Sequence, residues 1–276
     1  MKIKEITTKD YVTKSNLPSS DYVINPYVGC PHGCKYCYAS FMKRFTNHEE
    51  PWGEFIDIKR CEKEIDIKKL AGKRVFMSSV TDCYNEFEEK YKITRNILKR
   101  LVECDCELNI STKSSLILRD LDLLKRMNNL CVSLSINTLD EKFKNDMDNA
   151  SSISSRLNTL KELHENGIKT VLFMSPIFPY ITDCIGIIEK SKDYVDECWF
   201  ENLNLRGPYK KDILDYIKSN YDLYYKDYIN IYVNNDMTYW NELGNKLNDY
   251  CCKHNIKYKN YFYHDELVKK KKESIN

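Results

Sequence analysis

Three cysteines stand close together in the segment 29–38, which reads GCPHGCKYCY. Cys30, Cys34 and Cys37 are separated as C-x3-C-x2-C. A disulfide uses two cysteines, and a structural zinc site uses four ligands. Three thiolates instead suit a [4Fe–4S] cluster, because they hold three of its irons and leave the fourth open to a small chelating molecule. The short spacing favours this interpretation, since three sulfurs must converge on one cluster.

The residues between the cysteines are suited to a tight loop. Gly29 and Gly33 tolerate unusual backbone angles, and Pro31 stiffens the chain. His32 offers a fourth ligand, so a zinc site made of His32 and the three cysteines is the alternative. Zinc sites are more often built from separate knuckles, which favours the cluster.

The composition of the 276 residues is that of an ordinary globular protein, with 42% hydrophobic and 30% charged residues. No apolar run approaches the roughly 20 residues of a membrane span, and the N-terminus lacks a secretory apolar region. We therefore expect a cytoplasmic protein without a membrane partner. The net charge of +2 does not by itself favour a nucleic-acid binding module. The lysine run 269–272 is typical of a solvated end.

Nine further cysteines are scattered among apolar neighbours, where we expect them to act as small buried side chains. A second cluster would have to use Cys104, Cys106, Cys251 and Cys252, whose spacings are not those of ferredoxins or zinc ribbons.

Strand-like and helix-like segments alternate along the chain. Predicted strands cover 22–27, 74–80, 107–112, 130–137, 170–176 and 194–203, and predicted helices cover 88–102, 116–127, 152–166 and 182–192. We expect Gly167 to end the third helix and Pro176 to stop the fifth strand.

Six such units predict an α/β fold with a parallel sheet, in the form of an open, partial (β/α)6 TIM-type barrel. Its site should lie at the carboxyl ends of the strands, where the cysteines follow strand one. We expect residues 1–208 to form this core and residues 209–276 to form a helical or mixed cap with a basic tail. The cap contains a further predicted strand at 228–233. The segment 257–264 is interpreted as an edge strand or a core segment, with a base-stacking segment as the alternative.

The cysteine motif, with Tyr36 directly before Cys37, resembles the signature of radical S-adenosylmethionine (radical SAM) enzymes. The segments NPYVGCPHGCKYCYA, SSVTDCYNEFEEKYKITRNIL and TKS are similar to the branch related to spore photoproduct lyase, and most of all to radical SAM mobile pair proteins. The resemblance covers roughly residues 21–208. It implies a [4Fe–4S] cluster on Cys30, Cys34 and Cys37, with S-adenosylmethionine (SAM) as the second cofactor.

The resemblance also implies the reaction. One electron cleaves SAM into methionine and a 5′-deoxyadenosyl radical, which abstracts hydrogen from a substrate in a lyase- or transferase-type reaction. The substrate would be a nucleic acid, or alternatively a peptide or a small metabolite. Implied partners are a reductant such as flavodoxin or ferredoxin and a second radical SAM protein. A non-catalytic iron–sulfur or zinc-binding protein is the alternative of another class.

The resemblance assigns residues to the methionine end of SAM. Ser79 and Thr81 would face its amine, and the two-residue period of a strand would place them on one face. Lys113 would pair with the carboxylate. Ser135 would reach the ribose or the carboxylate, with Asn137 on the same face.

The adenine end of SAM involves other positions in the resemblance. Tyr36 would contact adenine largely through its backbone, and Met174 and Ser175 fall where the family packs the ring.

A hydrogen-relay residue is harder to assign from the resemblance. Spore photoproduct lyase has a hydrogen-donating cysteine where this chain has Ser79. Cys83 and the adjacent Tyr84 are the alternative relay candidates.

The end of the sixth predicted strand is the candidate substrate site. Glu201, Asn202, Asn204 and Arg206 would lie over the mouth of the barrel, and Arg206 could hold a phosphate or carboxylate through a bidentate contact.

Overall fold

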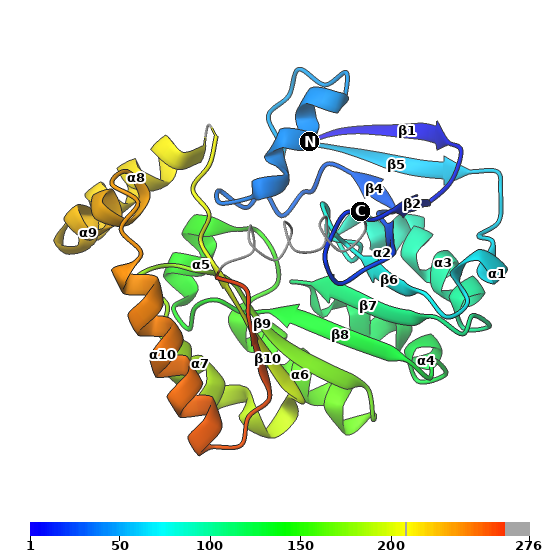
Figure 1. Ribbon diagram of the computed structural model, residues 1–276. Helices are drawn as coiled ribbons and strands as arrows, with labels where there is room; N and C mark the ends of the chain where they lie inside the picture. The colour runs from blue at the N-terminus through cyan, green and yellow to red at the C-terminus, as the bar shows by residue number, and fades with distance from the viewer. Residues whose placement is uncertain (208, 263–276) are drawn as a thin grey trace, which may run out of the picture.

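A large, mostly parallel sheet forms the centre of the computed structural model, which describes residues 1–207 and 209–262 (Figure 1). Its order is β11-β10-β9-β8-β7-β6-β3-β2, and β2 is antiparallel to β3 while the other neighbours are parallel. The strands are β2 (Val12–Lys14), β3 (Tyr22–Ile24), β6 (Arg74–Met77), β7 (Glu107–Thr112), β8 (Leu130–Ser135), β9 (Lys169–Ile177), β10 (Glu197–Asn202) and β11 (Tyr258–Asn260).

The strands from β3 to β10 follow one another in chain order across this sheet, which confirms the predicted α/β fold with a parallel sheet. The narrower prediction of a partial barrel stays a prediction. The carboxyl ends of these parallel strands meet at one edge, because neighbouring parallel strands run in the same direction. Strand β9 continues through Pro176 to Ile177, so the expectation that Pro176 stops it was wrong.

Helices occupy most of the connections between the parallel strands. They are α1 (Ile67–Leu70), α2 (Phe87–Tyr91), α3 (Ile93–Leu101), α4 (Leu121–Leu124), α5 (Glu141–Met147), α6 (Ile153–Glu165) and α7 (Cys184–Ser191), with 3-10 helices η1 (Tyr38–Phe45), η2 (Ser115–Asp120) and η3 (Lys192–Tyr194). Helix α6 follows the sequence closely. Its N-cap Ser152 accepts a hydrogen bond from Ser155 N at 3.2 Å, and Gly167 adopts a φ of +75° just beyond its end.

The helix predicted over 88–102 is divided into α2 and α3. Lys92 lies between them with a φ of +52°, and the Glu88 carboxylate accepts the Thr94 and Arg95 backbone N–H groups at 2.8 and 3.1 Å. These N–H groups start α3, so the side chain replaces the carbonyl partners that a continuous helix would supply. The helix predicted over 116–127 is likewise divided into η2 and α4.

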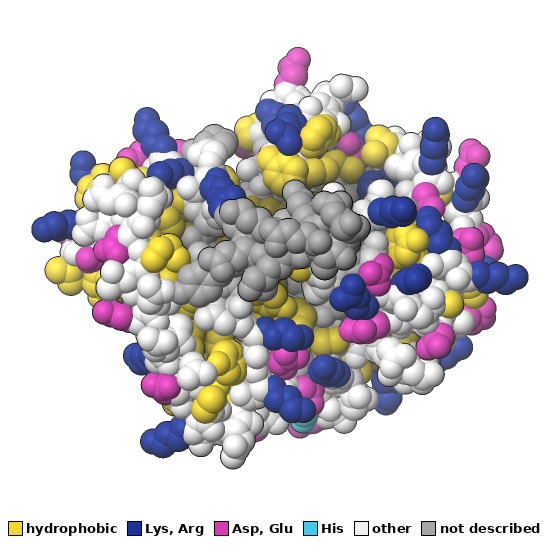
Figure 2. Space-filling view, viewed as in Figure 1, with side chains coloured by type: hydrophobic (Ala, Val, Ile, Leu, Met, Phe, Trp, Pro, Cys, Tyr) yellow, Lys and Arg dark blue, Asp and Glu magenta, His cyan; other side chains and the backbone are white. Residues whose placement is uncertain are grey.

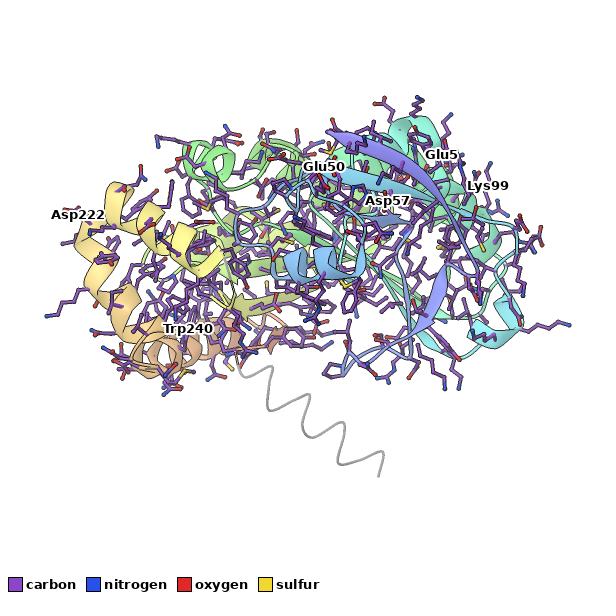
Figure 3. The ribbon with its side chains drawn as sticks, turned by 90° about the horizontal axis from the view of Figure 1, so that it is seen from above. Glu5, Glu50, Asp57, Lys99, Asp222 and Trp240 are labelled. Atoms are coloured by element: carbon purple, nitrogen blue, oxygen red, sulfur yellow. The ribbon has the colours of Figure 1, made fainter. Side chains whose placement is uncertain are left out.

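A second sheet, which was not predicted from the sequence, lies beside the cysteine loop. It consists of β1 (Lys2–Thr8), β5 (Phe55–Cys61) and β4 (Tyr27–Val28), with β1 parallel and β4 antiparallel to β5. Seen from above, this sheet lies at one end of the molecule, with Glu5 and Asp57 labelled, and Asp222 and Trp240 lie at the other (Figure 3).

The C-terminal region is mainly helical, with α8 (Tyr209–Asn220), α9 (Asp222–Tyr232) and α10 (Thr238–Lys253) ahead of β11. The strand predicted at 228–233 was wrong, since these residues belong to α9 and the turn after it. The predicted edge strand is confirmed as β11, whereas residues 263–264 and the run 269–272 lie outside the described part. Trp240 and Cys251 of α10 share a core with Met174 and Phe200 of the sheet.

The charges on the face seen in Figure 2 are interspersed, with Lys and Arg next to Asp and Glu. None of the helices in the described ranges is long and apolar enough to cross a lipid bilayer.

Candidate functional site: the cysteine loop and two adjoining cavities

The three cysteines line one cavity of about 110 Å³, together with the segment after β6 and the end of β7. Two short turns shape their loop, because Gly33 N donates to Cys30 O at 3.2 Å and Cys37 N donates to Cys34 O at 3.1 Å. Gly29 has a φ of +82°, and a Cβ there would lie 2.3 Å from the Phe55 carbonyl oxygen. Strand β5 therefore packs so closely on the loop that only glycine fits.

The thiols of this loop are chemically suited to a cluster. Burial raises the pKa of Cys30 to about 12, and it also raises the pKa values of Cys34 and Cys37. Neutral thiols are thus favoured until a metal supplies the positive charge that stabilises thiolates.

His32 is the fourth ligand that the zinc alternative requires. Within residues 1–207 and 209–262, no group of three His, Cys, Asp or Glu side chains is arranged around one metal position. His32 is buried, and its Nδ1 lies 3.4 Å from Asp82 Oδ2 instead.

Tyr36 fixes the cysteine loop through a hydrogen bond to Asp148. Its buried hydroxyl donates to Asp148 Oδ2 at 2.9 Å, and Asp148 pairs with Arg156 at 2.7 Å, where both side chains are 1% exposed. Arg156 also donates to the Ser135 carbonyl at 3.2 Å. A buried ion pair with further hydrogen bonds gives the loop a fixed position against α5 and α6. Asp148 was not among the predicted residues.

Asp82 joins the cysteine loop to the sheet, and it also was not predicted. Its carboxylate accepts the Thr112 hydroxyl and the Lys113 backbone N–H, both at 2.8 Å. It lies in the same cavity as the three thiols and beside His32. This carboxylate fixes the end of β7, from which the Lys113 side chain extends.

Ser79 and Thr81 line the cavity, but the prediction that a strand places them on one face was wrong. Strand β6 ends at Met77 and Ser78 has a φ of +76°, so no strand period relates them. The Thr81 hydroxyl donates to Gly29 O at 2.6 Å, and Ser79 Oγ accepts Asn25 Nδ2 at 2.9 Å. The Thr81 hydroxyl thus holds the start of the cysteine loop, and Ser79 binds the segment that precedes it.

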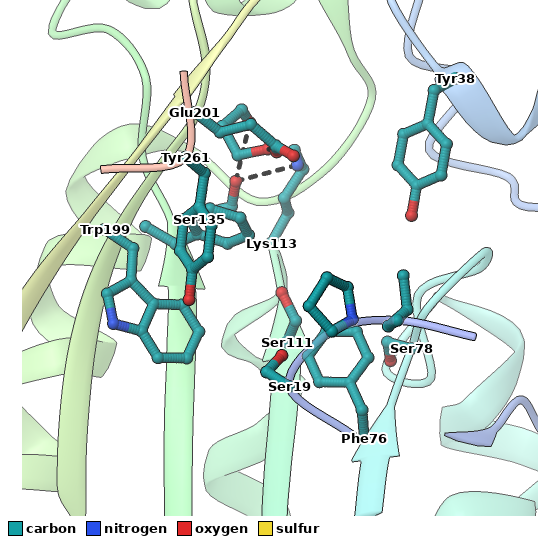
Figure 4. A pocket seen from close by; sticks show the side chains of 14 residues that line it. Ser19, Tyr38, Phe76, Ser78, Ser111, Lys113, Ser135, Trp199, Glu201 and Tyr261 are labelled. Atoms are coloured by element: carbon teal, nitrogen blue, oxygen red, sulfur yellow. Dashed lines mark hydrogen bonds between the residues drawn. The ribbon is translucent and has the colours of Figure 1, made fainter. Parts of the chain in front are cut away.

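Figure 4 shows the lining of a second cavity of about 200 Å³, which adjoins the first. The two share Tyr38, Ser78, Ser111, Lys113 and Ser135. The other described residues that line the second cavity are Leu17, Pro18, Ser19, Phe76, Phe173, Ser175, Trp199, Glu201 and Tyr261.

The structure brings four predicted residues together in this cavity. Lys113 Nζ donates to Ser135 Oγ at 2.9 Å, and Ser135 Oγ donates to the Ser175 carbonyl at 3.0 Å. Ser175 Oγ donates in turn to Glu201 Oε2. A chain of hydrogen bonds therefore crosses the ends of β7, β8, β9 and β10.

Several other predicted residues are not among the described residues that line the two cavities. Met174 points to the opposite face of β9 and is fully buried in the core there. Asn137 donates to the Pro176 carbonyl at 3.1 Å. Cys83 and Tyr84 are fully buried in the core between β6 and α3.

Only part of the predicted substrate segment lines the second cavity. Glu201 lines the second cavity, whereas Asn202, Asn204 and Arg206 do not. Asn204 is exposed, and its carbonyl accepts the Tyr209 hydroxyl at 2.6 Å. The chain leaves the sheet after Asn202, which carries the later side chains away from the strand ends.

Several lining residues were missed although the sequence contains a signal for them. Ser111, Phe173 and Trp199 each stand two residues before another lining residue, as the period of a strand requires, and Phe76 lines the cavity from β6. Checking the residue two positions before each predicted site residue would have identified the first three. Tyr38 follows the last cysteine in η1, where no strand period applies.

A three-cysteine loop at the carboxyl ends of a parallel sheet is the arrangement of an iron–sulfur enzyme of the α/β class. The family model of the radical SAM superfamily matches residues 24–189, and the chain belongs to this superfamily. It is therefore a radical SAM enzyme, and family membership implies a [4Fe–4S] cluster and SAM.

Two relatives share enough sequence to align over much of the chain. The protein MJ0683 of Methanocaldococcus jannaschii is 38% identical over 222 residues, which cover 80% of this chain and 84% of that protein. The protein ORF301 of Acidianus two-tailed virus is 33% identical over 174 residues, 58% of this chain and 57% of that protein.

Solved structures with a similar fold include spore photoproduct lyase bound to SAM and dinucleoside spore photoproduct. It has a TM-score of 0.59 at 17% identity, covering 77% of this chain and 65% of the lyase. Streptococcus suis SuiB bound to SAM has a TM-score of 0.54 at 16% identity, covering 86% of this chain and 49% of SuiB. At these identities the likeness concerns the fold.

Proposed function

We propose that this enzyme cleaves SAM reductively in the cavity of the three cysteines and directs the resulting radical at a substrate in the adjoining cavity. The observation that carries the proposal is that Cys30, Cys34 and Cys37 line one cavity with Lys113 and Ser135, which also line the other. A cofactor bound at the first cavity would therefore touch the second.

The cysteines would hold the cluster, which when bound with SAM supplies the electron that releases methionine and the 5′-deoxyadenosyl radical. Lys113 would pair with the SAM carboxylate, and its presence in the lining of both cavities supports this role. Ser135 orients the Lys113 ammonium through the 2.9 Å hydrogen bond. Ser175 would contact the nucleoside part of SAM, and Tyr36 would contact adenine through its backbone.

Some predicted roles are revised in this proposal. Ser79 and Thr81 act by positioning the loop and the segment that precedes it, and Asn137 and Met174 support the strand ends from the core. Cys83 and Tyr84 are left out as relay residues because they are fully buried away from both cavities. Glu201 is retained as the substrate-contacting residue of its segment.

The substrate class is a proposal of its own. The lyase of similar fold binds a dinucleoside, and this supports a nucleic-acid component as the substrate. We further propose that residues 1–208 form a partial barrel that carries the chemistry and that residues 209–276 form its cap. A flavodoxin- or ferredoxin-like reductant, a second radical SAM protein and a cytoplasmic location complete the proposal.

Anaerobic reconstitution of the full chain with iron and sulfide tests the cofactor and the cleavage together. We expect acid-labile sulfide in the protein and 5′-deoxyadenosine after addition of SAM and dithionite, measured by liquid chromatography. Cys34→Ala should abolish product formation, whereas Cys252→Ala, at an exposed cysteine of α10, should not. One zinc per chain without sulfide, or product from Cys34→Ala, would contradict the proposal.

A further inference from the structure

Aromatic side chains form much of the wall of the second cavity. Phe76, Phe173, Trp199 and Tyr261 line it, and Tyr38 lies across from the last two (Figure 4). The Phe173 and Trp199 rings meet edge to face at a centroid distance of 5.7 Å, and the Trp199 and Tyr261 rings do so at 5.9 Å. Rings fixed in this way offer flat surfaces to a planar guest.

Glu201 is the one carboxylate among the described residues that line this cavity. Its Oε2 accepts the Ser175 hydroxyl, and its side chain is half-buried. Within the described ranges, no Lys or Arg lies within ion-pair distance of this carboxylate. The single lysine of the cavity wall, Lys113, donates to Ser135 instead. Glu201 therefore keeps acceptor capacity for a guest in the cavity.

The geometry points to a planar nitrogen heterocycle with two adjacent N–H donors, the edge presented by guanine, as the substrate group held by Glu201. This inference rests on the proposed function and names the substrate class of the same site. A carboxylate accepts two neighbouring N–H groups well, and hydrogen bonds to a charged acceptor are the stronger kind. Uracil places carbonyls beside its N–H, and adenine and cytosine place an acceptor nitrogen beside the amino group, so each would repel the carboxylate.

The same chemistry could be offered by a free nucleoside or by a guanine within a single strand. The aromatic side chains could stack on the guanine base of either ligand, because stacking needs only the flat face of the base. The binding experiment therefore needs an arm for each source.

The test uses the reconstituted full chain with S-adenosylhomocysteine present to occupy the SAM position. Equilibrium dialysis measures the binding of guanosine, inosine and uridine. We expect guanosine to bind and inosine, which lacks the exocyclic amino group, to bind about tenfold more weakly, with uridine weaker still. Because inosine is compared on the unaltered protein, this result does not depend on how any variant folds.

The test variant is Glu201→Gln. The matched control is Glu107→Gln, because Glu107 is exposed at the amino end of β7. Glu201→Gln should weaken guanosine binding about tenfold, and Glu107→Gln should leave it unchanged. Circular dichroism reports whether each variant is folded. Equal binding of guanosine and inosine, or unchanged binding by a folded Glu201→Gln protein, would overturn the inference.

A thymidine oligonucleotide with a single guanine separates the two sources. Tighter binding than guanosine, with no binding of an all-thymidine strand, assigns the group to a nucleic acid. Binding no tighter than guanosine assigns it to the free nucleoside. If the protein forms 5′-deoxyadenosine but does not bind guanosine, only this inference fails. If it forms none, the proposed function itself fails.

Discussion

Cys83 illustrates how burial decides between two roles for one residue. Its side chain is fully buried in the core, its N–H binds Ser78 Oγ at 2.9 Å and its carbonyl accepts the Thr94 hydroxyl at 2.7 Å. Burial also raises the pKa of its thiol well above the ordinary value. These contacts give the residue a packing role between β6 and α3.

Cys83→Ala should therefore keep SAM cleavage and lose stability by about 1 kcal/mol, because a buried sulfur is removed from the core. Product formation and urea unfolding are the two measurements. Loss of cleavage in a folded variant of unchanged stability would show that Cys83 acts in the chemistry and not only in packing.

On β9, the predicted adenine contact Met174 is one residue away from the side chains that line the cavity. Met174 was expected at the site, but Phe173 and Ser175 line the cavity and Met174 lies in the core. The sequence could identify the strand, since its apolar run is clear. It could not set which alternate residues face inward, because every position from Thr170 to Met174 is apolar or small enough to be buried.

Strands were predicted better than their surroundings. The bounds of β7 agree with the predicted 107–112, and α6 lies within the predicted 152–166. The pairing of β1 with β5 was missed, because it joins residues about fifty positions apart and β1 is largely exposed. Local pattern contains no information about such a partner.

Helix α9 shows why a local pattern can mislead. The segment 228–233 is rich in aromatic and β-branched residues, which favour strands. Tyr228 and Ile231 are the buried residues of α9, and their spacing of three is that of a helix face. Packing against the neighbouring core thus decided the conformation.

The break between α2 and α3 places Glu88 at the centre of a buried ion network. The carboxylate is fully buried, accepts the Tyr27 hydroxyl and pairs with Arg119 at 2.7 Å. Arg119 also binds the buried Asp120 at 2.7 Å.

Glu88→Gln should lower the free energy of unfolding by about 3–5 kcal/mol, because one partner of a buried pair is lost. Glu64→Gln is the matched control, since Glu64 pairs with Arg100 at an exposed position and should change little. Guanidinium unfolding measures both. Equal, small effects of the two substitutions would show that the network does not support the fold.

Lys59 of β5 provides a pH-dependent prediction. Burial lowers the pKa of its ammonium from 10.5 to about 8, and Nζ donates to the Asn25 carbonyl at 2.8 Å. Between these two pKa values the unfolded chain binds more protons than the folded chain, so this group adds stability as pH rises from 8 to 10.5.

The difference in unfolding free energy between the wild type and Lys59→Met should therefore move in favour of the wild type between pH 7 and pH 10. Chemical unfolding at the two pH values measures it, and other titrating groups cancel in the difference. A difference that is independent of pH would mean that Lys59 is not desolvated.

At the scale of the whole molecule, the C-terminal helices complete the core. Strand β11 pairs with β10, where Cys198 N donates to Lys257 O at 2.9 Å and Tyr261 N donates to Phe200 O at 2.8 Å. Trp240 of α10 is almost fully buried in the core shared with β9 and β10.

A chain that stops at residue 208 should therefore aggregate, because it exposes the edge of β10 and the apolar surface beneath Trp240. Sedimentation and dye binding to exposed apolar surface test this. A soluble, monomeric fragment with one cooperative unfolding transition would show that the core folds without its cap.

The position of β11 also affects how the protein is made. Translation produces the strands of the large sheet in order along the chain, and the neighbour of β10 is the last of them to leave the ribosome. Until residues 258–260 emerge, the nascent chain presents an unpaired strand edge beside finished β-α units. A chaperone that shields such edges during synthesis should raise the yield of this protein more than one that acts after release.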